Sequence, residues 1–122
     1  MKNLFLFMFL MFMAPLAMAT PPTEILLSYD KEKEVLHVEA THVSNKPEKH
    51  YLRKFIVSLN GNPQPEIYFH RQVDPAKFVT DIPLKAKEGD VIAVEISCSQ
   101  GGVKTEELTI PVEEKKDDTH KE

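Results

Sequence analysis

The sequence has few of the residues and motifs that identify common protein classes. It contains one cysteine, Cys98, which excludes an intramolecular disulfide. It contains no glycine-rich phosphate loop, no CxxC pair, no HExxH and no nucleophile elbow, which excludes most enzyme classes that a motif can identify. The length of 122 residues predicts one domain and excludes a second catalytic domain.

The sequence also lacks a large excess of charge of either sign. The chain has 15 Lys and Arg against 19 Asp and Glu, a formal net charge of −4. The basic residues alternate with acidic ones along the chain and form no continuous basic stripe. This pattern disfavours nucleic acid and lipid surfaces as partners.

One long hydrophobic run occurs, at the beginning of the chain. Residues 4–16 are almost all Leu, Phe and Met, they follow Lys2, and they precede the small-x-small sequence Ala17-Met18-Ala19. This run is too short for a permanent transmembrane anchor and is typical of a signal peptide. We therefore expect residues 1–19 to be removed by cleavage between Ala19 and Thr20, and the protein to be exported to the periplasm. An unpaired Cys98 in that oxidising compartment has to be buried, bound to a metal or reactive.

The rest of the chain consists of short β-type runs separated by turn residues. In 34–41, for example, Leu36, Val38 and Ala40 alternate with more polar residues, which predicts a half-buried strand. Seven strands are expected, at 24–29, 34–41, 50–59, 66–70, 78–84, 91–98 and 103–110. In 50–59, one face should carry Tyr51, Phe55, Val57 and Leu59.

This spacing predicts an all-β fold, an immunoglobulin-like antiparallel β-sandwich of about seven strands over residues 20–112. An open barrel is the alternative. Proline cannot donate a hydrogen bond in a sheet, so Pro83 and Pro111 should lie at sheet edges or strand ends. The charged tail, 113–122, has no apolar anchor and is expected to be disordered.

Histidine and cysteine are the residues that point to chemistry, because their nitrogen and sulfur atoms are ligands for Fe, Zn and Cu. His42 follows the strand 34–41, His50 opens the strand 50–59, and Cys98 closes the strand 91–98. Loops of a sandwich gather at its two ends, so these three residues can form a metal site if they share an end. Alternatively, Cys98 is an inert core thiol, because it continues the inward face of its strand, and both histidines are hydrogen-bonded loop residues.

The other histidines are weaker candidates. His37 should face solvent, His70 ends a strand, and His120 lies in the tail. Whether His37 or His70 supplies a further ligand is left open by the sequence.

Three stretches resemble the iron-binding domain of superoxide reductases (desulfoferrodoxin and neelaredoxin), over roughly residues 24–111. They are Thr41-His42 with His50-Tyr51-Leu52, Leu59-Asn60-Gly61, and the segment 95–102, EISCSQGG. The resemblance implies an immunoglobulin-like sandwich holding non-haem ferrous iron, with His42 and His50 as ligands and Cys98 as the axial thiolate. It also implies one-electron reduction of superoxide, with an external electron donor.

The chain departs from that family's pattern at several ligand positions. Val43 replaces a proline, the loop to His50 is two residues longer, and Gly101 stands where the family has a histidine. No histidine near Pro21 and Pro22 corresponds to the family's upstream ligand. Three of the five ligands are therefore present, which leaves zinc or copper open as alternatives to iron.

The chain also resembles the Z subunit of the bacterial thiosulfate-oxidising carrier pair, which has the same sandwich and binds its partner protein without a metal. The likeness lies in the first loop and in the segment from Gly89-Asp90-Val91 to Ile110. Cys98 favours the iron-binding relative, whereas Gly101 favours a sulfur-carrier or protein-binding module.

Overall fold

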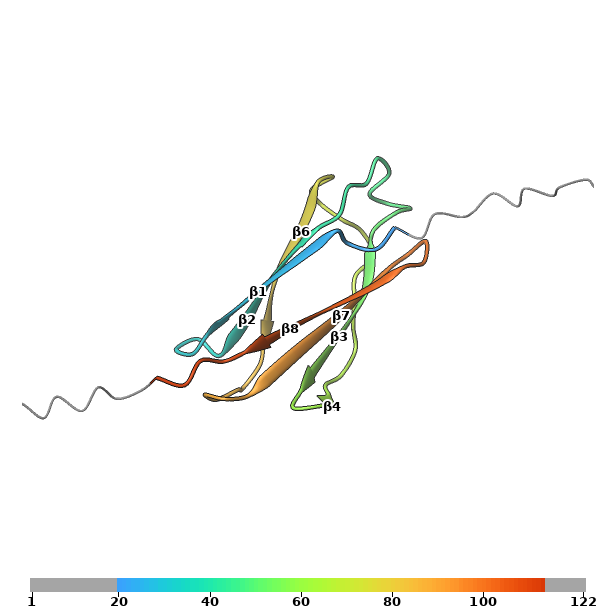
Figure 1. The fold of residues 1–122 in the computed structure, drawn as a ribbon. Helices are drawn as coiled ribbons and strands as arrows, with labels where there is room; N and C mark the ends of the chain where they lie inside the picture. Colours follow the sequence, from blue (N-terminus) through green and yellow to red (C-terminus); the bar gives the residue numbers. More distant parts are fainter. Residues whose placement is uncertain (1–19, 114–122) are drawn as a thin grey trace, which may run out of the picture.

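The computed structural model describes residues 20–113. The expected signal peptide, 1–19, and all but the first residue of the expected tail, 113–122, lie outside the described residues. Within them the protein is all-β, and eight strands form two antiparallel sheets (Figure 1). No helix of this part of the chain is long and apolar enough to cross a membrane.

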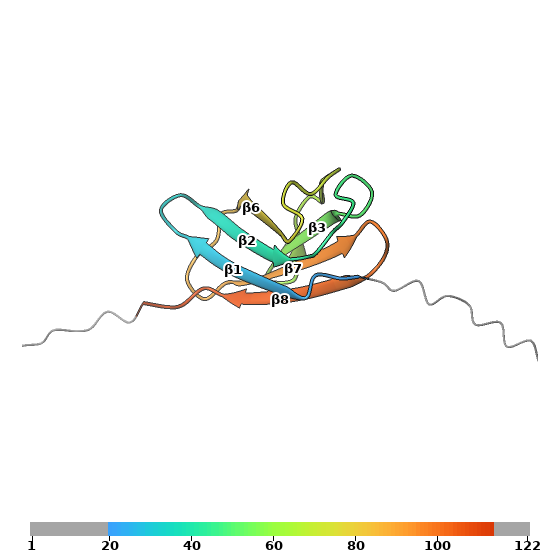
Figure 2. The ribbon, with the colours of Figure 1, turned by 90° about the horizontal axis from the view of Figure 1, so that it is seen from above.

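The strands follow one another with short connections. They are β1 (Glu24–Asp30), β2 (Val35–Thr41), β3 (Leu52–Leu59), β4 (Asn62–Pro63), β5 (Ile67–Tyr68), β6 (Lys77–Pro83), β7 (Val91–Cys98) and β8 (Val103–Thr109). One sheet has the order β1-β2-β6, and the other has the order β4-β3-β7-β8 with β5 also paired to β3. Figure 2 shows the two sheets as separate layers.

The distribution of strands between the sheets is that of an immunoglobulin-like sandwich. In the constant-type fold the first, second, fourth and fifth strands share one sheet, and the third, sixth and seventh share the other. The fourth strand differs here, because β4 and β5 lie in the sheet of β3. The two-residue strands β4 and β5 both pair with β3 and lie one after the other along it. Counted as one interrupted strand, they give the seven strands expected from the sequence.

Alternation of inward and outward side chains builds the core, as the sequence pattern predicts. Leu36, Val38 and Ala40 of β2 are completely buried. Ile92 and Val94 of β7 are also completely buried. These residues come from different sheets, so the apolar faces of both sheets form one core between the two layers.

The expected inward face of β3 is wrong at its beginning. Leu52 is completely buried, whereas Tyr51 is half-buried. The pairing of β3 with β7 shifts between Leu52, opposite Cys98, and Lys54, opposite Ser97, so Arg53 is an extra residue in β3. Such a β-bulge turns the preceding residues to the other face, which simple alternation does not predict.

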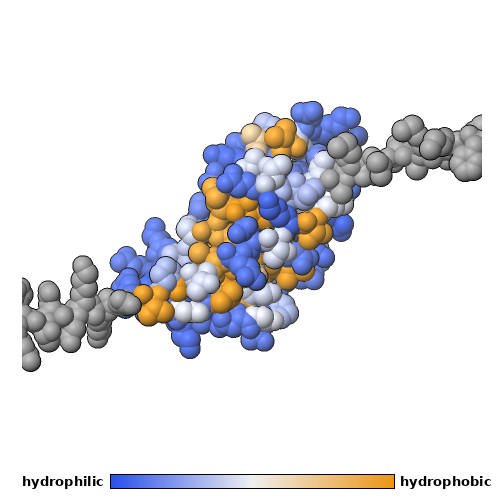
Figure 3. All heavy atoms as spheres, viewed as in Figure 1, coloured by the Kyte–Doolittle hydropathy of each residue, from blue (hydrophilic) through white to orange (hydrophobic). Residues whose placement is uncertain are grey.

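The positions of both prolines are confirmed. Pro83 is the last residue of β6, an edge strand of its sheet, and Pro111 follows β8. Two further edge strands, β1 and β8, contact each other where the two sheets meet. On the face drawn in Figure 3, apolar side chains gather over this region and hydrophilic ones surround them.

Candidate metal centre

Three strand ends meet at one end of the sandwich. His42 directly follows β2, His50 lies just before β3, and Cys98 is the last residue of β7. Pairing of β3 with β7 places Leu52 opposite Cys98, so the start of one strand adjoins the end of the other. The structure thereby places Cys98 at the same end as the two histidines, which the sequence left open.

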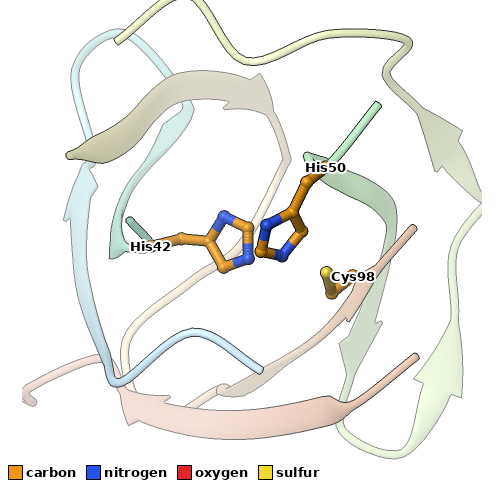
Figure 4. Close-up of side chains that lie close together, drawn as sticks. All are labelled: His42, His50 and Cys98. Atoms are coloured by element: carbon orange, nitrogen blue, oxygen red, sulfur yellow. The ribbon is translucent and has the colours of Figure 1, made fainter. Parts of the chain in front are cut away.

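The side chains of His42, His50 and Cys98 point toward one another (Figure 4). The two imidazole rings are edge to face, with centroids 4.6 Å apart and planes at 78°. One nitrogen from each ring and the sulfur lie within 4.8 Å of one another. The three residues therefore form a compact cluster of potential metal ligands.

The cluster can hold one ion after it contracts. In a tetrahedral site, metal–nitrogen bonds of about 2.1 Å and metal–sulfur bonds of about 2.3 Å hold two ligand atoms about 3.4–3.6 Å apart. Separations of up to 4.8 Å therefore need to contract by about 1.2–1.4 Å at most.

Hydrogen bonds determine which nitrogen of His42 carries the proton. His42 is 2% exposed, and its Nδ1 lies 2.8 Å from Oε1 of Gln72. The orientation of the Gln72 amide is defined, because its Nε2 donates to the carbonyl oxygens of His42, at 2.6 Å, and Asp74, at 2.8 Å. Oε1 must therefore accept, and the Nδ1–H group of His42 donates to it.

This assignment leaves a lone pair on Nε2 of His42 without a hydrogen-bond donor. The nearest polar atom is the carbonyl oxygen of Thr20, at 3.1 Å, which is also an acceptor. A metal cation between the two acceptors satisfies both, as does a proton on Nε2 that is donated to the Thr20 carbonyl. In metal sites a ligating histidine commonly donates its other N–H group to a carbonyl or carboxylate, as His42 does to Gln72.

The loop between β2 and β3 is held by its own hydrogen bonds, which position His50. The His50 N–H group donates to the Lys46 carbonyl at 2.7 Å, and the Ser44 hydroxyl donates to the His50 carbonyl. Burial of the half-buried ring, and to a smaller extent the neighbouring His42, lowers the pKa of His50 below 6.5. The neutral imidazole that this favours is the form that binds metals.

Cys98 belongs both to the core and to the cluster. It is 6% exposed and packs with the hydrophobic core. Its N–H group donates to the Gly102 carbonyl, and its carbonyl accepts from Gly101, so a tight turn follows it directly. The last inward position of β7 is thus also the position nearest the histidines. Burial of Cys98 therefore does not distinguish an inert core thiol from a metal ligand.

Two residues of the site were missed in the sequence. Gln72 is completely buried and orients His42, but it lies in an irregular segment whose pattern carries no signal. Thr20 contacts all three cluster residues: its hydroxyl oxygen lies 2.6 Å from Nε2 of His50 and 3.6 Å from the Cys98 sulfur, and its carbonyl faces His42. Its place directly after the expected cleavage site was the available signal.

The remaining histidines do not complete the ligand set. His37 pairs with Asp81 at 2.6 Å, and its side chain is 43% exposed. His70 is exposed. Among residues 20–113, the one cluster of metal-ligating side chains found contains neither of them, because the sheet topology places both elsewhere. His120 lies outside the described residues.

Comparisons of the chain with protein-family models and with curated proteins gave no match. A function therefore has to be argued from the chemistry of the site, because a sandwich fold is shared by proteins of many functions.

Proposed function

We propose that this chain is an exported metal-binding protein in which His42, His50 and Cys98 hold one transition-metal ion. The lone pair on Nε2 of buried His42 carries the proposal, because it faces only the carbonyl oxygen of Thr20. An unpaired lone pair at a buried site is costly, and a bound cation removes that cost. A cation bound at this nitrogen can also be contacted by the ring of His50 and the thiol of Cys98.

Two imidazoles and one thiolate suit iron, zinc and copper, and we propose non-haem iron as the resident metal, with zinc and copper as alternatives. Iron supplies one-electron chemistry, and the resemblance to superoxide reductases makes superoxide the proposed substrate, with an external electron donor. The protein residues contribute the binding, the burial of His42 and Cys98, and the orientation of His42 by Gln72.

A small molecule can approach the cluster from the surface. A hollow of about 570 Å³ is lined by Thr20 and His42 together with the exposed side chains of Val43 and Val103, among others. Its position beside His42 leaves one side of the cluster open to a small ligand.

The charge near the site favours an anion. A second hollow, beside Gln72, is lined by Lys46, Lys49, Arg71 and one acid, Glu48, among others. In a chain with a net charge of −4 this is a local excess of positive charge. Such an excess raises the local concentration of an anionic substrate such as superoxide.

Metal analysis tests the proposal. The full chain is produced with its own leader and no polyhistidine tag, and the purified protein is given ferrous iron, zinc or cupric ions without oxygen. We expect stoichiometric binding, and a thiolate-to-iron charge-transfer band on oxidation of the iron form. His42→Ala and Cys98→Ser should abolish both, whereas His37→Ala and His70→Ala serve as matched controls outside the cluster and should retain them.

Absence of stoichiometric binding for all three metals would overturn the proposal. A stable protein partner recovered with such a metal-free chain would then support the sulfur-carrier or protein-binding alternative. For the iron form, consumption of superoxide without oxygen evolution is the expected activity. Evolution of oxygen would indicate dismutation and refute the reductase assignment while leaving the metal site intact.

A further inference from the structure

Thr20 occupies the centre of the cluster. Its hydroxyl oxygen lies between the His50 ring, at 2.6 Å from Nε2, and the Cys98 sulfur, at 3.6 Å. Its carbonyl oxygen lies 3.1 Å from Nε2 of His42. Both oxygen atoms of one residue therefore face the three potential ligands.

The segment that follows Thr20 is anchored on both sides. Pro22 is completely buried, and the Thr23 N–H group donates to the Thr41 carbonyl at 2.9 Å, next to His42. On the other side, a Cβ atom at Gly102 would lie 2.8 Å from Pro21 and 3.1 Å from the backbone nitrogen of Thr20. Thr20 is thus packed directly against the turn after Cys98.

We propose that Thr20 becomes a further metal ligand once cleavage after Ala19 makes it the first residue, binding through its new α-amino nitrogen and its hydroxyl oxygen. This inference rests on the metal site and the cleavage proposed above. The N-terminus of the mature chain would then supply a ligand that the side chains of residues 20–113 do not supply.

Cleavage changes the chemistry of the Thr20 nitrogen. In the uncut chain this nitrogen belongs to a peptide bond, and its lone pair is delocalised into the carbonyl group. After cleavage it is an amine with a free lone pair. In a gauche rotamer of the side chain, covalent geometry places it about 2.9 Å from the hydroxyl oxygen, so one ion can be bound by both atoms in a five-membered chelate ring.

The added nitrogen suits the site. His42 and His50 are the only imidazoles in the cluster, and an amine adds a third neutral nitrogen donor beside the thiolate. The uncut precursor lacks this donor, so it should bind the metal more weakly than the mature chain. Metal loading would then follow export.

The test moves the amine without altering the side chains of the site. Two residues, Ser-Gly, are inserted between Ala19 and Thr20, so that the cleaved chain begins upstream of Thr20, and mass spectrometry identifies each N-terminus. Thr20→Ser, which keeps the amine and the hydroxyl, is the matched control, and Thr20→Val keeps the amine alone. The probe is cobaltous ion without oxygen, followed by its visible ligand-field bands.

We expect the insertion to weaken cobalt binding by about 10- to 100-fold and to shift the ligand-field bands. Thr20→Ser should bind like the native chain, and Thr20→Val should lie between them. Equal affinity and identical spectra for the native and extended chains would overturn the role of Thr20 while the metal site stands. Absence of cobalt binding in every chain would instead overturn the metal site itself.

A second measurement separates ligation from folding. Each metal-free chain is melted, and if the insertion lowers the melting temperature, the α-amino group of the native mature chain is converted to a ketone by transamination. This change adds no residue, and it should weaken cobalt binding to the same extent as the insertion. Unchanged binding in the transaminated chain would refute the inference.

Discussion

Replacing Gln72 by methionine removes the polar groups that hold His42 while keeping a side chain of similar length. Gln72 is completely buried, and its side chain makes hydrogen bonds to Nδ1 of His42 and to the carbonyl oxygens of His42 and Asp74. Gln72→Met leaves three polar groups without these partners. The two groups on His42 are buried, whereas the Asp74 carbonyl is only partly buried and can bind water.

The expected loss of stability follows from these two buried groups. Each unpaired buried donor or acceptor costs about 1–3 kcal/mol, so Gln72→Met should lower the free energy of unfolding by about 2–6 kcal/mol. This is a large part of the roughly 5–15 kcal/mol that stabilises an ordinary domain. The freed His42 ring should also lower metal affinity, by about 10- to 100-fold.

Urea unfolding of the metal-free protein, followed by far-ultraviolet circular dichroism, measures the first effect, because the chain has no tryptophan for fluorescence. Gln64→Met is the matched control. The Gln64 amide makes one exposed hydrogen bond, at 3.3 Å to the Asn62 carbonyl, and its loss should cost less than about 0.5 kcal/mol. A loss below about 1 kcal/mol for Gln72→Met would refute the hydrogen-bond assignment at His42.

Three further results are expected. Gly102→Ala should reduce both stability and cobalt affinity more than Gly101→Ala does. Both glycines have positive φ, 93° and 92°, but only at Gly102 would a Cβ atom meet Pro21 and Thr20. Equal effects in the two variants would contradict this packing. In the metal-free protein, histidine NMR should give His50 a titration midpoint below 6.5, since burial and His42 disfavour its charged form. The contribution of His50 to stability is therefore present above pH 6.5 and is lost as the pH falls through its lower pKa in the folded state. A midpoint at or above 6.5 would be evidence against this. Leu36 is completely buried, so Leu36→Ala should lower the free energy of unfolding in urea by about 2–5 kcal/mol, whereas Leu26→Ala, at a position 52% exposed, should lower it by less than about 1 kcal/mol. Similar losses for both variants would argue against the core assignment.

Much of the fold could be predicted because its signals are local. The alternation of Leu36, Val38 and Ala40 identifies an inward face, and the bounds expected for the strand 91–98 agree with those of β7. The β-bulge at Arg53 was not predictable in this way, since its only effect on the sequence is to interrupt the alternation. The same interruption led to Tyr51 being placed on the inward face instead of Leu52.

The candidate site was predicted in part for a related reason. His42, His50 and Cys98 are visible in the sequence because metal-ligating residues at strand ends are uncommon enough to stand out in so short a chain. Gln72 and Thr20 are ordinary polar residues in irregular segments, and only their contacts with the cluster distinguish them.

The sequence alone determined that the chain is all-β and that two imidazoles and one thiol lie next to strand ends, because inward faces repeat every second residue and turns interrupt that repeat. It favoured a sandwich over an open barrel. The tertiary structure decided which strand ends share one end of the sandwich, and so that Cys98 meets the histidines while His37 and His70 do not. It also decided that Gln72 and Thr20 complete the surroundings of His42. These contacts join residues 22 to 78 positions apart, and they depend on how strands pair across the sheets, which no local pattern of side chains encodes.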